Sequence, residues 1–470
     1  MTDTYITRFR KTAGVLTAAA FVMSLVVLAP TPAAARHINC GVITEDTTLT
    51  EDVTECPGYG LIIRADNITL NLNRHTVSCD NTFPEQVGIL LDGVSGVTVT
   101  NGTVEGCDAG VSIEGGGGNT VRHILARDNV NDMEEPFDPT GPPPEGSTLA
   151  DILCDYGDGI LTFNSGNNLI ERNHVYGNGP YSGISLVEEG SDGNIVRDNR
   201  VENNDLLNYR PGTEVVNPET GAVTGQTSLC GATLPGEPGM QRGRNNQDIG
   251  IRIEGPGADN NHVGSNQVHE SALAGISVHS HVCNPRPGDS RGVTDPNVNN
   301  RIDRNTVTGT GNDTFATDPT ADGIGLLAQG PIGNVTCGSN DNTVTNNRSN
   351  DNRRHGILVN VDNTDNTIRR NQVNNNDRDG IFVATHGTVP ASRNLLQENR
   401  GTGNGEHDGH DANPNCDANR WIANQFATIN QSCVGGGGTV VAAAGGASAT
   451  ASVAAADEDS GNVNRGPRSS

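Results

Sequence analysis

One short pattern recurs along most of this chain and restricts the folds open to it. Each copy has a glycine followed by an aliphatic residue and a short alternating stretch, then a turn rich in glycine and asparagine, then N-x-h-x-x-N-x-V, where h is apolar. Clear copies are DGILTFNSGNNLIERNHV, IGIRIEGPGADNNHVGSNQV and HGILVNVDNTDNTIRRNQV (residues 158–175, 249–268 and 355–373). A pattern that returns in this way indicates a repeat architecture.

The glycines that begin the copies set the period, and the closely spaced ones are 22 to 25 residues apart. One unit holds two short alternating strands and too little apolar surface to fold alone. Copies are therefore expected to stack and to bury their Ile, Val and Leu side chains in one continuous core. Wider spacings are interpreted as units that carry insertions. These glycines are Gly88, Gly110, Gly159, Gly183, Gly250, Gly275, Gly323, Gly356 and Gly380.

The stretch DNTIRRNQVNNN (residues 365–376) mixes turn residues with Ile368 and Val373. A chain that turns sharply several times per unit needs residues that accept positive φ, as Gly, Asn and Asp do. Asparagines stacked at one level can also hydrogen-bond from unit to unit. We expect the asparagines to form corners and ladders, with Ile368 and Val373 inside. A ligand-binding row of asparagines is the less favoured alternative.

These strands and turns resemble the right-handed parallel β-helix repeats shared by pectate lyases, alginate epimerases and NosD-like exported proteins. DNITLNLNRHTVSC (residues 66–79) is similar to the first coil of many such proteins. The resemblance covers residues 40–433 and implies an all-β, single-stranded right-handed parallel β-helix, a pectin-lyase-like solenoid with loop insertions and disulfides. The family hosts lyases, hydrolases, epimerases and non-catalytic binders, so the resemblance does not imply one activity.

The two ends of the chain differ from the repeats. Arg8, Arg10 and Lys11 precede an apolar run and the small-residue sequence PTPAAA (residues 30–35), which is typical of a secretory signal peptide. We expect a leader at 1–35, a β-helix domain at 36–434 and a disordered Gly/Ala/Ser-rich tail at 435–470. No later segment is apolar for long enough to span a bilayer. The mature protein is therefore expected to be secreted, with attachment to a cell surface left open.

The net charge is −26, and no lysine follows Lys11. A field of this sign repels nucleic acid, anionic lipid and bare polyanions, which leaves neutral glycans, cationic partners and metal-bridged anions. The alternative interpretation is that the negative charge keeps the protein soluble in a salty medium. The metal is unknown, and Ca²⁺ is the ion left open, because the acidic stretches 131–139 and 311–322 offer oxygen ligands.

All ten cysteines follow the predicted leader, and CxxC is absent. An even number in an exported protein predicts disulfides rather than a zinc or redox site. Insertions before the Gly-aliphatic strand carry Cys154 and Cys230, and insertions after it carry Cys283 and Cys337. Insertions that leave the same edge of a stack are neighbours, which favours a disulfide within each of these two sets. Spacing alone does not determine connectivity, so the pairings are hypotheses: Cys154–Cys230, Cys283–Cys337, Cys79–Cys107, Cys40–Cys56 and Cys416–Cys433.

Alternation along each strand predicts which side chains point outward. Outward charge gathers on two units, at Arg252, Glu254 and His279. Neighbouring strands are about 4.8 Å apart, so Glu254 and His279 are expected to touch. In a catalytic site His279 would exchange a proton, Glu254 would orient it or act as an acid, and Arg252 would hold a sugar carboxylate. An exposed salt-bridge cluster is the simpler interpretation.

The long insertions border these units and are expected to wall a groove over them. His281, Phe163 and Asn360 are the residues expected to contact a substrate there. Apolar outward residues such as Phe163 suit sugar stacking, although aromatic residues make up only 3% of the chain.

A second column lies just before the unit glycines, at Asp322, His355 and Asp379. Aspartate before glycine usually accepts a hydrogen bond from nearby backbone, which is the favoured role here. The tract EHDGHD (residues 406–411) contains metal-capable side chains, but its spacing matches no strong motif. A role in the capping loop is favoured for it.

Together these features predict a secreted carbohydrate-active protein that acts on an extracellular polysaccharide, as a lyase, an epimerase or a hydrolase. The alternative is a non-catalytic glycan-binding or cell-wall matrix protein. Lyases of this fold often use Lys or Arg as the base, and the mature chain has no lysine, so Arg, His or Tyr would have to serve.

Overall fold

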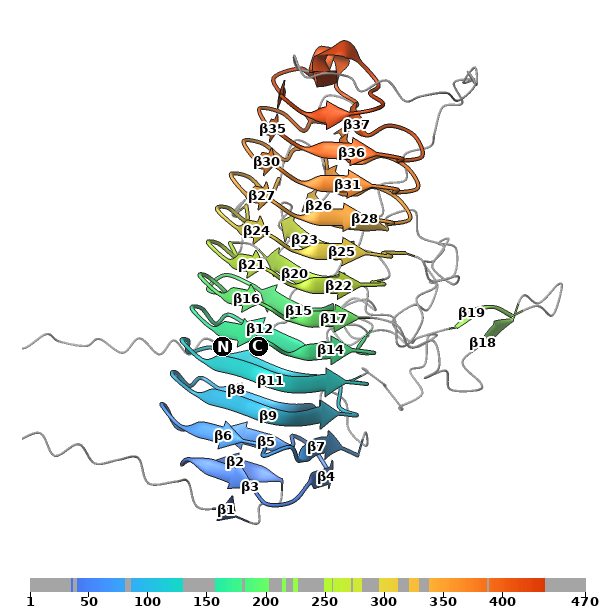
Figure 1. The fold of residues 1–470 in the computed structure, drawn as a ribbon. Coiled ribbons are helices and arrows are strands. Elements are labelled where there is room, and N and C mark those ends of the chain that lie inside the picture. Colours follow the sequence, from blue (N-terminus) through green and yellow to red (C-terminus); the bar gives the residue numbers. More distant parts are fainter. Residues whose placement is uncertain are drawn as a thin grey trace, which may run out of the picture. The chain divides into compact units, whose positions relative to one another are not determined.

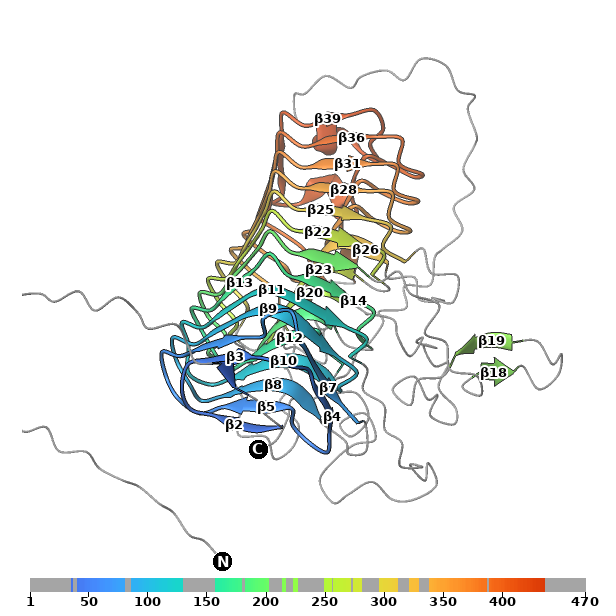
Figure 2. The same ribbon diagram turned by 60° about the horizontal axis from the view of Figure 1, so that its bottom comes forward.

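Short parallel strands, stacked coil on coil, make up this protein (Figures 1 and 2). The computed structural model describes residues 35–36, 40–80, 86–129, 157–179, 182–202, 214–216, 223–226, 249–255, 257–271, 274–280, 296–311, 321–328, 338–386 and 389–435. Within them the chain forms a single-stranded right-handed parallel β-helix, as the repeat predicts. No helix in this described part is long and apolar enough to cross a membrane.

A 12-stranded parallel sheet receives one strand from each coil, and this sheet carries both predicted sites. Its strands follow one another in chain order, so each strand lies between those of the preceding and following coils. They are β2 (Gly41–Ile43), β5 (Leu61–Ile63), β8 (Val87–Asp92), β10 (Ala109–Glu114), β12 (Ile160–Phe163), β15 (Ser182–Val187), β20 (Ile249–Gly255), β23 (Ala274–Ser280), β26 (Asp322–Ala328), β29 (Ile357–Val359), β32 (Ile381–Val383) and β37 (Gly409–Asp411).

A 23-stranded sheet forms the remaining wall, and most coils add two short strands to it. They are β1 (Ala35–Arg36), β3 (Thr47–Leu49), β4 (Val53–Cys56), β6 (Thr69–Asn71), β7 (Thr76–Cys79), β9 (Thr98–Glu105), β11 (Thr120–Arg127), β13 (Leu169–Glu171), β14 (His174–Tyr176), β16 (Ile195–Arg197), β17 (Arg200–Glu202), β21 (His262–Gly264), β22 (Gln267–His269), β24 (Arg301–Asp303), β25 (Thr306–Thr308), β27 (Thr343–Thr345), β28 (Arg348–Asn350), β30 (Thr367–Arg369), β31 (Gln372–Asn374), β35 (Leu395–Gln397), β36 (Arg400–Thr402), β38 (Arg420–Ile422) and β39 (Gln425–Phe426).

The few other elements are short. Two antiparallel pairs join β18 (Glu214–Val216) to β19 (Val223–Gln226) and β33 (Thr385–His386) to β34 (Val389–Pro390). Two 3₁₀ turns are also present: η3 (Pro414–Cys416) lies between β37 and β38, and η4 (Ser432–Gly435) follows β39.

The interior is one continuous column of aliphatic side chains. Ile251, Ile253, Ile276 and Val278 are fully buried in it, as the alternation along β20 and β23 predicts. Ile368 and Val373 are likewise buried in it, as expected for the stretch 365–376.

Close approach of neighbouring coils explains why glycine begins each unit. A Cβ on Gly275 would lie 2.6 Å from the carbonyl oxygen of Gly323, and one on Gly356 would lie 2.6 Å from that of Gly380. Because these contacts are to the backbone of the next coil, a side chain here would force the coils apart. The reason for glycine at these positions is therefore space between coils rather than positive φ.

Asparagine ladders run through the corners of the stack, as predicted. In the two longest, the backbone N–H of each asparagine donates to the side-chain Oδ1 of the asparagine one coil further on, at 2.8–3.0 Å. The members are Asn119, Asn168, Asn194, Asn261, Asn300, Asn342, Asn366, Asn394 and Asn419 in one, and Asn173, Asn199, Asn266, Asn305, Asn347, Asn371, Asn399 and Asn424 in the other.

Corner and ladder roles fall on neighbouring residues rather than on the same one. Asp365 and Arg370 have φ of 60° and 57°, and each directly precedes a ladder asparagine. Arg370 shows that the corner itself does not require asparagine. Asparagine recurs at the ladder positions from coil to coil because buried backbone N–H groups need an acceptor.

Three predicted disulfides are confirmed: Cys40–Cys56, Cys79–Cys107 and Cys416–Cys433. The other two predicted pairs, Cys154–Cys230 and Cys283–Cys337, lie outside the described residues. So do the predicted leader up to residue 34, the tail from residue 436, and most of both acidic stretches proposed for Ca²⁺. The domain boundaries therefore stay predictions.

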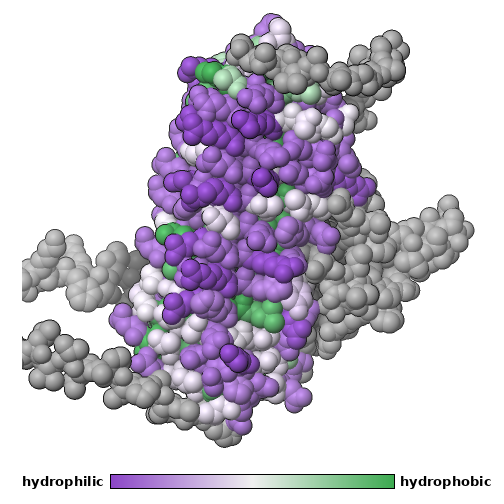
Figure 3. Space-filling model, viewed as in Figure 1, coloured by the Kyte–Doolittle hydropathy of each residue, from purple (hydrophilic) through white to green (hydrophobic). Residues whose placement is uncertain are grey.

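The face of the solenoid in Figure 3 is mostly hydrophilic, with scattered hydrophobic residues. Arginine–carboxylate pairs between coils contribute to this surface, among them Arg197 with Glu171 at 2.7 Å and Arg393 with Asp365 at 2.6 Å. Such partly exposed pairs contribute little to stability individually.

Removing one ladder asparagine tests how much the ladders stabilise the fold. Asn305 accepts from the backbone N–H and the side-chain Nδ2 of Asn266, and donates to the carbonyl of Val263. Asn305→Ala removes the acceptor of the buried backbone N–H of Asn266 and the donor to the carbonyl of Val263, so the free energy of unfolding should fall by about 2 kcal/mol. Chemical denaturation of this variant and of Gln267→Ala, an exposed side chain on β22, measures it. Equal stability of the two variants would contradict a stabilising role for the ladder.

Candidate functional site

Three residues predicted from the sequence, Phe163, Glu254 and His279, share one outward column on the 12-stranded sheet. Phe163, Val187, Glu254, His279 and Leu327 follow one another in register on five successive coils. The structure thus brings Glu254 and His279 side by side, as the alternation predicts.

Burial distinguishes Glu254 and His279 of this column, and Arg252 in the outward row beside it. Arg252 and Glu254 are only 1% and 2% exposed and form an ion pair with each other, while His279 is half-buried. A guanidinium that is buried against its own carboxylate is poorly placed to hold a sugar carboxylate. The catalytic roles of these three residues stay predictions.

The expected substrate contacts are spread along the stack. Phe163 is half-buried at the end of β12, two coils before Glu254 in the column. Asn360 follows β29, and its Oδ1 accepts the N–H of Val361 at 2.8 Å, so it supports its own turn. His281 and most of the insertions expected to wall a groove lie outside the described residues.

The second column is longer than the sequence suggested. The register of β26, β29, β32 and β37 aligns Asp322, His355, Asp379 and His407 on four successive coils. Acids and imidazoles therefore alternate along it. Oδ1 of Asp322 accepts the backbone N–H of His355 at 3.2 Å, so the expected backbone-acceptor role is present, directed at the next coil.

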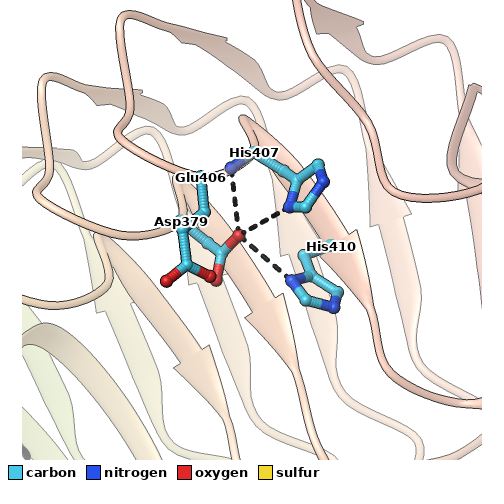
Figure 4. A group of neighbouring side chains, drawn as sticks. All are labelled: Asp379, Glu406, His407 and His410. Atoms are coloured by element: carbon cyan, nitrogen blue, oxygen red, sulfur yellow. Dashed lines mark hydrogen bonds and ion pairs between the residues drawn. The ribbon is translucent and has the colours of Figure 1, made fainter. Parts of the chain in front are cut away.

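Asp379 is the centre of this column. Its carboxylate is fully buried, and Oδ1 lies 3.3 Å from Nδ1 of His407 and 3.1 Å from Nδ1 of His410 (Figure 4). The same oxygen accepts the backbone N–H of His407 at 3.1 Å. One buried carboxylate thus orients two imidazoles, whose side chains are 33% and 21% exposed.

On the other side of Asp379, Nδ1 of His355 lies 3.2 Å from Oδ2. That nitrogen also lies 3.3 Å from the backbone N of Asp379, in a geometry that lets it accept this N–H. A single ring nitrogen serves as a donor or as an acceptor, but not as both. Used as the acceptor, it leaves Oδ2 of Asp379 as a buried oxygen without a hydrogen-bond donor.

Charged side chains lie at the edge of the column. Nε of Arg378 lies 2.7 Å from Oε1 of Glu406, and Nε of Arg354 lies 3.4 Å from Oδ1 of Asp322. Arg378 and Glu406 are 46% and 40% exposed, so solvent reaches this edge.

An aromatic strip lies beside the polar column. Leu358, Phe382 and His410 are in register on β29, β32 and β37. The ring of Phe382 stacks on that of His355 at 4.6 Å and meets that of His410 edge-on at 4.8 Å. These contacts limit how the two imidazoles can turn.

Burial and neighbouring charges shift the protonation of this cluster in different directions. Burial lowers the pKa of His355 to about 4, despite its contact with Asp379. The hydrogen bond with Asp379 raises the pKa of His407 above its ordinary value. Burial disfavours the charged form of Asp379, but the contacts from His355, His407 and His410 prevail and hold its pKa well below the usual range.

The tract 406–411 divides between two roles. Asp408 and Asp411 are fully buried and hold the last coils together, the first by accepting the N–H groups of Ala427 and Thr428 and the second by accepting the indole N–H of Trp421. This is the expected capping role. Glu406, His407 and His410 instead lie with Asp379, and one ligand atom from each of the four lies within 4.8 Å of the others.

The sequence analysis assigned Asp379 and His407 to separate features. In the register of β32 and β37, Asp408 takes the position of Gly380, and Gly409 takes that of Ile381. The last unit therefore has neither the glycine nor the aliphatic residue of the repeat, so it escaped the pattern.

Two family models match the chain. Residues 52–228 match the model described as right handed beta helix region, and residues 326–438 match the one described as periplasmic copper-binding protein (NosD). The second match spans the whole cluster around Asp379. A search of curated protein sequences found no match.

Solved structures with a similar fold come from proteins of several kinds. The A-module of the Azotobacter vinelandii mannuronan C-5 epimerase AlgE6 shares 11% identity at a TM-score of 0.45, covering 82% of this chain and 85% of that one. PfbA, a surface adhesin of Streptococcus pneumoniae, shares 10% at 0.45, covering 77% of each chain. Pectate lyase Pel9A shares 12% at 0.40, covering 83% and 73%. At this identity the likeness concerns the fold, and we draw no function from it.

The low pKa of His355 makes stability depend on pH. As the pH falls below about 6.5, the unfolded chain takes up a proton at this residue and the folded protein does not, so stability is lost towards pH 4. Between pH 7 and pH 5, His355 should lower the free energy of unfolding by about 2 kcal/mol. Thermal and chemical unfolding in the presence of a chelator should show a smaller loss over this interval for His355→Gln than for the unsubstituted protein. His123→Asn, at an exposed position, is the control and should lose as much as the unsubstituted protein; an equal loss in His355→Gln would refute the assignment.

Proposed function

Because the chain forms a right-handed parallel β-helix and residues 52–228 match the model of that name, we propose that it is an exported protein that binds an extracellular polysaccharide and modifies it on the outer face of β26, β29, β32 and β37. The proposal moves the site from the column of Glu254 and His279 to that of Asp379. Exposure is the reason, since the histidines and charged residues of the second column reach solvent.

The single observation that carries the proposal is the pair of aromatic rings, Phe382 and His410, beside the polar column. Phe382 is half-buried and packs on the buried side chains of Leu358, Val361 and Ala384, so its ring is the apolar group that a ligand can reach in this row. A sugar ring has an apolar face and a rim of hydroxyl groups, so it suits a surface that is apolar in one row and polar in the next. Strands about 4.8 Å apart give both rows the same repeat.

The polar row supplies groups of both signs. Arg378 offers a guanidinium that can bind a carboxylate, and Glu406 offers a carboxylate that can accept from hydroxyl groups. His407 and His410 are oriented by a buried carboxylate, an arrangement suited to proton transfer near neutral pH.

This arrangement favours proton transfer next to a sugar carboxylate over hydrolysis. Glycoside hydrolases ordinarily use two carboxyl groups, one of which is a protonated acid. Asp379 cannot serve as that acid, since its contacts with three histidines keep it ionised. We therefore favour a lyase or an epimerase acting on a uronate-containing polysaccharide, with a non-catalytic glycan binder as the rival.

A screen of the secreted form on uronate-containing and neutral polysaccharides tests the reaction. Ultraviolet absorbance of unsaturated uronate reports a lyase, a changed epimer ratio by NMR reports an epimerase, and new reducing ends report a hydrolase. Retention of a glycan without any product would support the rival.

The position of the site is tested with two phenylalanines on the same sheet. Phe382→Ala removes the ring beside the polar column and should weaken binding of the glycan found in the screen about tenfold, roughly 1.4 kcal/mol. Phe163→Ala, also half-buried and several coils away, should leave affinity unchanged. Loss of binding in Phe163→Ala alone would instead place the glycan over the column of Glu254 and His279.

A further inference from the structure

We propose that Asp379, Glu406, His407 and His410 form a binding site for one divalent transition-metal ion. The proposal does not depend on a glycan, and it concerns the protein alone. It rests on the four converging side chains of Figure 4, which come from the turn before β32 and from the segment that enters β37.

The distances within the cluster are compatible with a bound metal as well as with weak hydrogen bonds. Hydrogen bonds between a charged carboxylate and an N–H donor are usually about 2.7–2.9 Å long. Oδ1 of Asp379 lies 3.3 and 3.1 Å from the two imidazole Nδ1 atoms, which is longer. Ligands on a tetrahedral ion with bonds of about 2.0–2.1 Å lie roughly 3.3–3.4 Å from each other. The two distances from Oδ1 of Asp379 are therefore close to the separation of ligands around one ion, and one ligand atom from each of the four residues lies within 4.8 Å of the others.

A second, independent observation points to a ligand. Asp379 is fully buried, and its Oδ2 has no hydrogen-bond donor when Nδ1 of His355, 3.2 Å away, accepts the backbone N–H of Asp379. The contacts of its carboxylate are all to histidines: His355, His407 and His410. A buried carboxylate without an arginine of its own is strongly destabilised unless a cation approaches it.

Arg378 does not block the site. Its guanidinium lies beside Glu406, with Nε 2.7 Å from Oε1 and Nη2 3.4 Å from Oε2. A carboxylate can serve an arginine through one oxygen and a metal through the other, and outer partners of this kind orient metal ligands.

The donor set selects the class of ion. Two imidazole nitrogens and two carboxylates suit Zn²⁺, Cu²⁺ or Ni²⁺, whereas Ca²⁺ and Mg²⁺ prefer oxygen ligands alone. The Ca²⁺ left open from the sequence is therefore not the ion expected here. A bound ion would supply a Lewis acid and positive charge on a strongly acidic protein.

Calorimetry with the metal alone tests the site on tag-free, chelator-treated protein. Titration with ZnCl₂ and with CuCl₂ should show one ion per chain, and the spectrum of the Cu²⁺ form in electron paramagnetic resonance should show coordinated nitrogen. Titration with CaCl₂ should show no binding to this site. Failure of Zn²⁺ and Cu²⁺ to bind, or stoichiometric binding of Ca²⁺ alone, would overturn the proposal.

Variants assign the ligands. Glu406→Gln changes a 40% exposed side chain and should weaken binding about tenfold or more, since even outer partners contribute about 10- to 100-fold. The double variant His407→Gln/His410→Gln should bind the metal more than about 100-fold more weakly. His174→Gln is the matched control, because His174 lies 3.2 Å from Glu202 in another histidine–carboxylate pair far along the chain.

Unfolding curves of the metal-free proteins separate a lost ligand from a lost fold. The Glu406→Gln and double variants should unfold cooperatively, and at one metal concentration the midpoint should rise less in them than in the unsubstituted protein and in His174→Gln. Equal affinity of Glu406→Gln, the double variant and the unsubstituted protein would show that the ion binds elsewhere.

Discussion

In-register stacking of coils is the constraint on which the rest of this structure depends. Because neighbouring strands are about 4.8 Å apart, a residue type repeated at one position of the unit becomes a continuous row of touching side chains. Asparagine repeated in this way forms the ladders from Asn119 to Asn419 and from Asn173 to Asn424. Aspartate and histidine repeated in this way form the column Asp322, His355, Asp379 and His407. The same geometry therefore supplies both the stability of the corners and the chemistry of the site.

Much of the fold follows from the sequence because it depends on local periodicity. Alternation determines that Ile251 and Ile253 point inward, and adjacency of coils determines that Cys79 meets Cys107. The reason for the repeated glycines could not be read in the same way. Gly275 and Gly356 are needed because a carbonyl of the next coil passes close by, and such a contact exists only once the coils are stacked.

The site was less accessible to sequence reasoning. Alternation places Arg252 and Glu254 on the outer face correctly, but it does not reveal that they are buried and paired with each other. Burial of an outward side chain depends on what else packs against the sheet, which period and spacing do not report. Asp379 and His410 are 31 residues apart, and they meet because β32 and β37 are neighbours. The last unit has Asp408 and Gly409 where the repeat has a glycine and an aliphatic residue, which concealed that relation.

The central claim is that stacking of the last coils brings Asp379 and His407 together as ligands of one metal ion. Anomalous diffraction from crystals grown with Zn²⁺, recorded on both sides of the zinc absorption edge, tests it most directly. The account predicts one strong anomalous peak about 2.0–2.2 Å from ligand atoms of Asp379, Glu406, His407 and His410. A map without a peak there, in which Oδ1 of Asp379 still receives both imidazole N–H groups, would contradict the claim and leave the cluster as a hydrogen-bonded end to the ladder.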